Sequence, residues 1–239
     1  MELTGKRGTD VYTNTLNLEF TVDHSEVFRY LGHSGGSMQD AARISRMVSD
    51  LYQDVKRFSV PRGIYGTFWL ERLSNGALFL PETSLCFHSQ DLKALLKDSE
   101  KVTIFAATLG RSVDQLISYL LASGEYVKAA IADAIGSAAA ESAIEQVNAI
   151  VREEAEREGK ALTGRFSPGY GDVPLTLQKD IVDLIGAKKV DIEVTEAFLL
   201  KPRKSVTALV GWTSRPSRCS GSRVPDCQSC RLISCRFRR

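Results

Sequence analysis

The sequence predicts an α+β fold, as a single domain with an antiparallel sheet and long helices, plus a cysteine-rich C-terminal tail. Stretches with the alternating pattern of strands and stretches with the helical 3.6-residue period are mixed along the chain. They do not follow the regular strand–helix alternation of a parallel sheet. With 43% apolar residues, the 239-residue chain can also build a substantial core. We place the domain at residues 1–212 and the tail at residues 213–239.

The first predicted elements are a strand and two helices. Apolar and polar side chains alternate over residues 16–22, which predicts a strand. Ser25 is placed to cap a short helix that ends at Gly32. A longer helix with one apolar face is predicted to start at Ser37, with Asp40 in the capping-box position.

The next segment is typical of a β-hairpin over residues 63–82. Its Asn75-Gly76 pair suits a type I′ turn, in which both residues take a positive φ. A helix near residues 90–96 and an apolar strand at residues 102–108 are predicted to follow.

A long helical pattern runs over residues 111–158, with an interruption near Gly124 and a plausible cap at Gly159. In its second part the apolar face changes near Gly136-Ser137. The helix is therefore either kinked there or buried on two sides. A helix at residues 175–185 and strands at residues 190–198 and 205–212 complete the domain, and we see no internal repeat.

Several common catalytic classes have no motif in this sequence. There is no P-loop, Rossmann glycine fingerprint, nucleophile elbow or HExxH pattern. The three histidines, His24, His33 and His88, have no spacing typical of a metal site or a triad. We therefore do not expect a self-contained hydrolase or metalloenzyme.

The stretch "GRFSPGYGDVPLTLQ", residues 164–178, is the most unusual local pattern. Arg165 offers a fork of donors suited to a carboxylate or phosphate. Gly169 and Gly171 allow a close approach of the backbone, and the two prolines restrict the loop. These features suit a small anionic or zwitterionic ligand. The alternative is a structural turn whose arginine pairs with a nearby acid.

Three segments together resemble the activation domain of cobalamin-dependent methionine synthase. They are "IADAIGSAAAESAIEQV", "RFSPGYGDVPLTLQ" and "VTEAFLLKPRKSV", which occur in the order of that family. The resemblance covers roughly residues 100–212. The resemblance implies an α+β domain that binds S-adenosylmethionine in a shallow groove. That ligand is the methyl donor when the cobalamin has decayed to cob(II)alamin. Residues 1–99 look like a short, free-standing form of the domain.

The resemblance also implies roles for individual residues. Arg165 matches the arginine that meets the ligand's carboxylate, and Ser167 and Gly169 match positions whose backbone contacts the ligand. Tyr170 matches the tyrosine that faces the ligand or the corrin. Glu141 aligns with a helix glutamate near the ligand's ammonium or ribose, with a solvated surface charge as its alternative.

The sequence departs from that family in two ways. It has no convincing match to an aspartate from the family's N-terminal segment, and it lacks the D-x-H-x-x-G motif that ligates cobalt. Thr195 and Glu196 lie on the later predicted strand. Their two alternative roles are to support the ligand site and to stabilise the fold alone. The function that the resemblance implies therefore requires cobalamin to be carried by a separate methionine synthase or another corrinoid protein, which is reactivated in trans. The alternatives are an accessory protein for another corrinoid methyltransferase and a non-catalytic S-adenosylmethionine-binding module.

The tail contains four of the five cysteines, Cys219, Cys227, Cys230 and Cys235. Four thiolates can hold an iron–sulfur cluster or zinc, although the outer spacings match no standard signature, and a tail without metal is the third alternative. An iron–sulfur tail could pass the single electron that reactivation needs.

The charge of the chain is unevenly distributed. Residues 213–239 hold seven arginines and one acid, whereas the rest of the chain carries a net charge of about −4. The basic tail could dock an acidic electron donor such as a flavodoxin or ferredoxin. Nucleic acid ranks lower as a partner, because the body is acidic. No secretion signal or membrane span is evident, so we expect a cytoplasmic location.

Overall fold

The computed structural model describes residues 13–32, 38–83 and 85–214. Its centre is a five-stranded, fully antiparallel sheet with the order β1-β2-β6-β10-β7. The strands are β1 (Asn14–Asn17), β2 (Arg62–Trp69), β6 (Ser99–Thr108), β10 (Ser205–Thr213) and β7 (Ala161–Leu162). The predicted α+β class with an antiparallel sheet is therefore confirmed.

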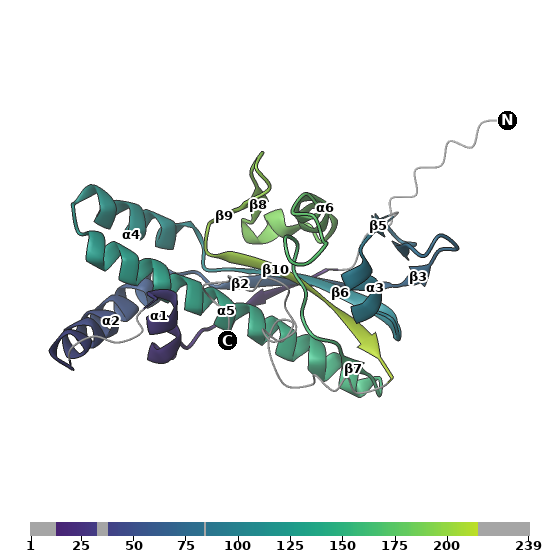
Figure 1. Ribbon diagram of the computed structural model, residues 1–239, viewed down its shortest axis with the longest axis horizontal. Helices are drawn as coiled ribbons and strands as arrows, with labels where there is room; N and C mark the ends of the chain where they lie inside the picture. The colour runs from purple at the N-terminus through teal and green to yellow at the C-terminus, as the bar shows by residue number, and fades with distance from the viewer. Residues whose placement is uncertain (1–12, 33–37, 84, 215–239) are drawn as a thin grey trace.

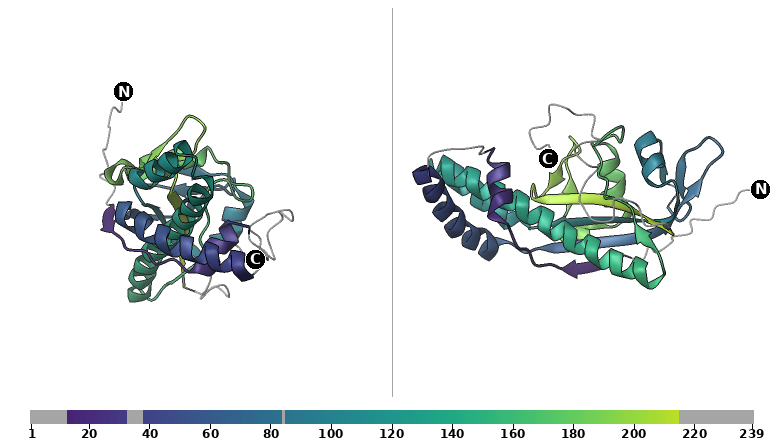
Figure 2. Two further views of the ribbon diagram at one scale, coloured as in Figure 1. Left: turned by 90° about the vertical axis from the view of Figure 1, so that its left-hand side faces the viewer. Right: turned by 60° about the horizontal axis from the view of Figure 1, so that its bottom comes forward.

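One face of the sheet is covered by α5 (Tyr126–Arg157), which crosses the strands obliquely (Figure 1). At 32 residues, α5 is about 48 Å long and extends beyond the sheet. Three further helices pack on the α5 side, as Figures 1 and 2 show: α1 (His24–Tyr30), α2 (Met38–Phe58) and α4 (Arg111–Ala122).

The opposite face of the sheet is covered by smaller elements (Figure 1). They are α3 (Gln90–Leu95), α6 (Leu177–Leu184), the 3₁₀ turn η1 (Ala187–Val190), and two small sheets. The first small sheet joins β3 (Glu71–Arg72), β4 (Leu78–Leu80) and β5 (Leu85–Phe87), and the second joins β8 (Glu193–Val194) and β9 (Leu200–Lys201).

The core consists of two apolar layers, one on each face of the sheet. Successive side chains of a strand point to opposite faces. Phe105 and Ala107 of β6 therefore lie in the layer under α5, while Ile104 and Ala106 lie in the layer under α3 and α6. This explains why β6 has a continuous apolar sequence.

Helix α5 is continuous through Gly136-Ser137, so its change of face reflects burial on two sides. Its alanines face the sheet on one side and the other helices on the other, and most are buried. The approach to the sheet is close: a Cβ placed on Gly63 of β2 would lie 2.7 Å from Cγ2 of Val147. The predicted break at Gly124 and end at Gly159 are also confirmed, since both glycines have positive φ at helix ends.

The N-terminal strand differs from the prediction, because it covers Asn14–Asn17 and not residues 16–22. The following backbone bonds to α5 side chains: Glu19 N–H donates to Gln146 (3.1 Å), and Thr21 N–H donates to Ser142 (3.2 Å). The cap of α1 is also Asp23, which accepts from the N–H of Ser25, so Ser25 is not the cap. Ser37 and the side chain of Asp40 lie outside the described residues.

The hairpin prediction was only partly correct. β2 joins the central sheet, and the hairpin is the shorter β3–β4 pair. Its turn is not type I′, since Gly76 has a φ of +77° but Asn75 does not share a positive φ. The bonds Gly76 N–H to Leu73 C=O (2.8 Å) and Leu73 N–H to Ala77 C=O (2.9 Å) close a three-residue loop with a glycine bulge.

The strand predicted at residues 190–198 is also wrong in extent. Only Glu193–Val194 forms a strand, and the chain then turns back into β9. Phe198 has a φ of +60°, and Thr195 accepts at its hydroxyl from Leu199 N–H (3.1 Å) within this turn.

Within residues 13–214, apart from the two gaps, no helix combines the length and apolar character needed to cross a bilayer.

Candidate functional site

The residues of the 164–178 stretch border a hollow of about 230 Å³ beside the start of β10. Its walls come from α5, the 165–170 loop, α6, and the strands β9 and β10. The lining residues are Glu141, Arg165, Phe166, Ser167, Pro168, Tyr170, Gln178, Leu200, Ser205, Val206 and Thr207. The hollow therefore joins segments that are far apart in the sequence.

The hollow exists because the last strand of the sheet covers only part of β10. Residues 161–166 run along the second half of β10, where Phe166 and Leu209 exchange two backbone hydrogen bonds (3.0 and 2.8 Å). The chain then leaves the edge, and the Ser167 hydroxyl donates to the Thr207 carbonyl (2.7 Å). Alternate residues of a strand direct their backbone groups to the same side, so the N–H of Thr207 also points toward this open edge.

Arg165 is buried, since only 8% of its surface is exposed, and its guanidinium reaches α5. Nη2 donates to Glu141 Oε2 at 3.1 Å. Nε is buried without a hydrogen-bond partner among the described residues, since Glu145 Oε2 lies 3.6 Å away. The Glu141 side chain is 41% exposed, so the guanidinium of this ion pair is buried while its carboxylate is in contact with solvent. The alternative weighed for Arg165, pairing with a nearby acid, is thus present in the structure.

The loop has two glycines with positive φ, Gly169 at +87° and Gly171 at +55°. Gly171 passes so close to α3 that an added Cβ would lie 2.0 Å from Oδ2 of Asp91. The same Asp91 oxygen accepts from Asp172 N–H (3.1 Å). The glycines therefore shape the loop and anchor it to α3. Gly169 lies next to the described wall of the hollow and not in it.

Asp172 strengthens this anchor from the other direction. Its carboxylate accepts from the Ser89 hydroxyl and from the backbone N–H of Gln90 (2.6 Å) and Asp91 (3.3 Å). The Ser89 hydrogen bond is the main reason that the pKa of Asp172 is held below its ordinary value. The loop is thus fixed to α3 at one end and to β10 at Ser167 at the other.

Two tyrosines belong to the surroundings of the site: Tyr170 lines the hollow, and Tyr30 is influenced by the charge of Glu141. Tyr170 is 53% exposed and lines the hollow. Tyr30 comes from α1, and burial raises the pKa of its phenol, with a further increase from the negative charge of Glu141. The N-terminal segment therefore contributes a phenol near Glu141, although no aspartate counterpart was found in the sequence.

The structure brings four of the five predicted binding residues, Arg165, Ser167, Tyr170 and Glu141, to one hollow. The prediction missed Gln178 and Thr207, which hydrogen bond to each other (Nε2 to Oγ1, 2.7 Å) and both line it. Gln178 ends the quoted stretch, but its direction depends on α6 packing against β10. Thr195 is part of the β8–β9 turn, outside the described wall of the hollow.

The predicted metal ligands Cys219, Cys227, Cys230 and Cys235 lie outside the described residues, so the tail site stays a prediction. Among the residues that the structure describes, no group of three or more His, Cys, Asp or Glu side chains is arranged to hold a metal ion.

Comparison with known proteins connects this architecture with a solved domain. No family model matches the chain, and no curated protein matches its sequence. Among solved structures, the chain is similar to one described as "Crystal Structure of the MetH Reactivation Domain bound to AdoHcy", with a TM-score of 0.65 and 18% sequence identity. The match covers 90% of this chain and 81% of that chain. This chain therefore has the fold of the MetH reactivation domain.

Proposed function

We propose that the hollow binds S-adenosylmethionine, and that the chain supports reductive methylation of cob(II)alamin carried by a separate corrinoid protein. The observation that carries the proposal is the Arg165–Glu141 pair at the wall of the hollow. Both residues were expected to bind the ligand from the resemblance of the sequence, and they occur in a fold of which one solved example is bound to AdoHcy, the demethylated form of the ligand.

An arginine–glutamate pair is complementary to the amino-acid end of S-adenosylmethionine. The ligand's carboxylate can take donors of the Arg165 fork, including the buried Nε that lacks a partner. Its ammonium can take the exposed oxygens of Glu141. Each charge of the ion pair then exchanges one partner for another, so neither group is left unpaired.

The edge of β10 supplies neutral polar groups for the rest of the ligand. The Thr207 N–H and the amide of Gln178 belong to the β10 and α6 walls of the hollow and are suited to hydrogen bonds with a ribose or a base. Tyr170, at 53% exposure, offers a ring face against which a flat group can pack.

The size of the hollow agrees with a ligand that stays partly exposed. Its volume of about 230 Å³ is below the roughly 300 Å³ at which enclosing ligand clefts begin. A methyl donor must present its methyl group to a cobalt on another protein, so an open site is required. One electron from a donor such as a flavodoxin or ferredoxin reduces cob(II)alamin to cob(I)alamin. The cobalt would then take the methyl group as the S–CH₃ bond breaks, and AdoHcy would leave as a neutral thioether.

Calorimetry with S-adenosylmethionine tests the binding step. Glu141→Gln removes the charge that faces the ammonium, and Arg165→Lys keeps the charge but loses the fork. Each should weaken binding about tenfold, the value of one charge-assisted hydrogen bond. Glu153→Gln is the matched control, since it lies on the same helix, exposed, and outside the described wall. Unchanged affinity in both site variants, with a lowered melting temperature, would leave the pair with a structural role only.

The second step is tested by adding the protein, S-adenosylmethionine and a reductant to an inactivated cobalamin-dependent methionine synthase that lacks its own reactivation domain. Restored turnover supports reactivation in trans. Binding without restored turnover would favour a module that binds the ligand without chemistry, and rescue of a different corrinoid methyltransferase would favour an accessory role there.

The tail stays a separate proposal within this function. If residues 213–239 hold an iron–sulfur cluster, anaerobically purified protein should be brown and contain iron. Zinc content without colour would select the zinc alternative, and metal-free protein would remove both.

A further inference from the structure

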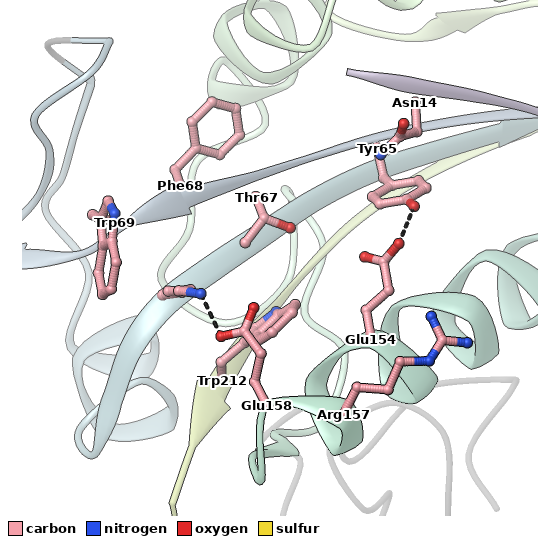
Figure 3. Close-up of a pocket in the computed structure, with 10 residues that line it drawn as sticks. Asn14, Tyr65, Thr67, Phe68, Trp69, Glu154, Arg157, Glu158 and Trp212 are labelled. Atoms are coloured by element: carbon pink, nitrogen blue, oxygen red, sulfur yellow. Dashed lines mark hydrogen bonds and ion pairs between the residues drawn. The ribbon is translucent and has the colours of Figure 1, made fainter. Parts of the chain in front are cut away.

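A second cavity, of about 510 Å³, lies at the other end of β10, between the sheet and the last turns of α5. Figure 3 shows Thr67 near its centre, Trp69 toward one end, and Tyr65 with Glu154 toward the other. The candidate site uses none of its lining residues. These are Asn14, Tyr65, Thr67, Phe68, Trp69, Lys101, Glu154, Arg157, Glu158 and Trp212.

Two tryptophans of this cavity already hold one cation. Lys101 Nζ lies 4.9 Å from the ring centroid of Trp69 and 5.0 Å from that of Trp212, and it pairs with Glu158 at 2.6 Å. Trp212 is fixed, because it is buried and its Nε1 donates to Thr103 Oγ1 (2.7 Å). Trp69 is 56% exposed, so much of its surface remains open. Such aromatic surroundings favour cations.

The carboxylate of Glu154 is the group that points to a second cation. It accepts from the neutral Tyr65 hydroxyl at 2.6 Å, and the described residues give it no cationic partner. Glu158, by contrast, is neutralised by Lys101. Arg157 also borders the cavity, but its side chain is 73% exposed and pairs with Glu153 (3.5 Å). The last carbonyls of α5 add partial negative charge at this end.

We propose that this cavity binds a guanidinium group, stacked against the exposed surface of Trp69 and hydrogen bonded to Glu154. A guanidinium is planar and weakly hydrated, so it can lie against an indole while its edge donates to a carboxylate. The cavity volume exceeds what one such group needs, so the rest of the ligand is accommodated as well.

Two sources can supply this group. One is a free ligand or partner that carries an arginine. The other is the chain itself, because residues 215–239 contain seven arginines and begin just beyond Trp212, which lines the cavity. Attachment to the same chain would raise the effective concentration of an arginine near the cavity.

The chain is well suited to a fluorescence test, because its only two tryptophans, Trp69 and Trp212, both line this cavity. The probe is N-acetyl-arginine amide, and the control is the citrulline analogue, which has nearly the same shape without the charge. Titrations use the full chain and a full-length variant in which the seven arginines of residues 215–239 are replaced by glutamine.

We expect a saturable fluorescence change with the arginine probe and none with the citrulline control. Tighter probe binding by the arginine-free variant than by the natural chain would identify the chain's own arginines as the occupant. Equal binding would identify an external ligand. Absence of a saturable change in both proteins, or an equal response to citrulline, would overturn the proposal.

Substitutions locate the site. Glu154→Gln keeps an acceptor for Tyr65 and removes the charge, so it should weaken probe binding at least about tenfold. Glu156→Gln, exposed on the same turns and outside the described lining, should leave binding unchanged. Equal binding by both variants, with equal melting temperatures, would contradict the assignment to Glu154.

Discussion

Replacement of Gly171 by alanine should weaken both the protein and its ligand site. Gly171 has a φ of +55°, a conformation that costs an L residue about 1 kcal/mol or more. The new Cβ would lie 2.0 Å from Asp91 Oδ2, so that side chain must move. Its movement breaks the hydrogen bond from Asp172 N–H (3.1 Å), which contributes about 1 kcal/mol. The total cost is then about 2 kcal/mol.

Gly124→Ala is the matched control for this prediction. Gly124 has a φ of +77°, but its Cβ would meet no atom within 4 Å, so the variant measures backbone strain alone. Thermal unfolding followed by circular dichroism should show the Gly171 variant about 2–4 °C less stable than the Gly124 variant. Calorimetry should show weaker S-adenosylmethionine binding only for Gly171→Ala. Equal melting temperatures and equal affinities in the two variants would refute the idea that contact with α3 holds the loop.

Three further predictions concern the packing and the loop. Gly63→Ala places a methyl group against Val147 of α5, and this overpacking should cost about 1–3 kcal/mol in denaturant unfolding; an unchanged midpoint would contradict the close packing. Ser167→Ala removes a hydrogen bond to the β10 backbone and should cost about 0.5–1.5 kcal/mol, with weaker ligand binding by calorimetry; intact affinity would place Ser167 outside the site. The depressed pKa of Asp172 stabilises the fold above its ordinary value of 3.8, and this contribution is lost as the pH falls through the folded-state pKa. Asp172→Asn should therefore be less stable than the natural protein at neutral pH, with a gap that closes in acid unfolding curves; a gap independent of pH would show that the charge is not involved.

The helices were the most predictable part of the fold. The break at Gly124 and the end at Gly159 follow from local chemistry, because glycine readily takes the positive φ that a helix end requires. The burial of α5 on both sides was one of two options from its pattern. Only the packing of the sheet and the other helices against it decides between them.

Strand ends were less predictable, because distant residues determine them. The segment after β1 alternates like a strand, but its backbone N–H groups bond to Gln146 and Ser142, more than 100 residues later. Likewise, the apolar pattern after Val190 is interrupted by a turn at Phe198 that propensity does not reveal.

Only those residues of the candidate site that belong to recognisable sequence motifs were predicted. Arg165, Ser167, Tyr170 and Glu141 were identified from short patterns and meet in one hollow. Gln178 and Thr207 were not, because their access to the hollow depends on where residues 161–166 stop covering β10. That boundary is a property of the sheet and not of either local sequence.

Because α5 is buried on two sides, insertions and deletions within this helix should not be tolerated. Glu141 and Glu154 are 13 residues apart on one helix and line different cavities, about 20 Å from each other along the axis. A single inserted or deleted residue between them would rotate the following part by about 100° and turn its alanines away from the sheet. Insertions are tolerable at the β3–β4 turn, whose residues are exposed, but not within Tyr126–Arg157. Proteins that share both cavities should therefore keep this 13-residue spacing, even where their side chains differ.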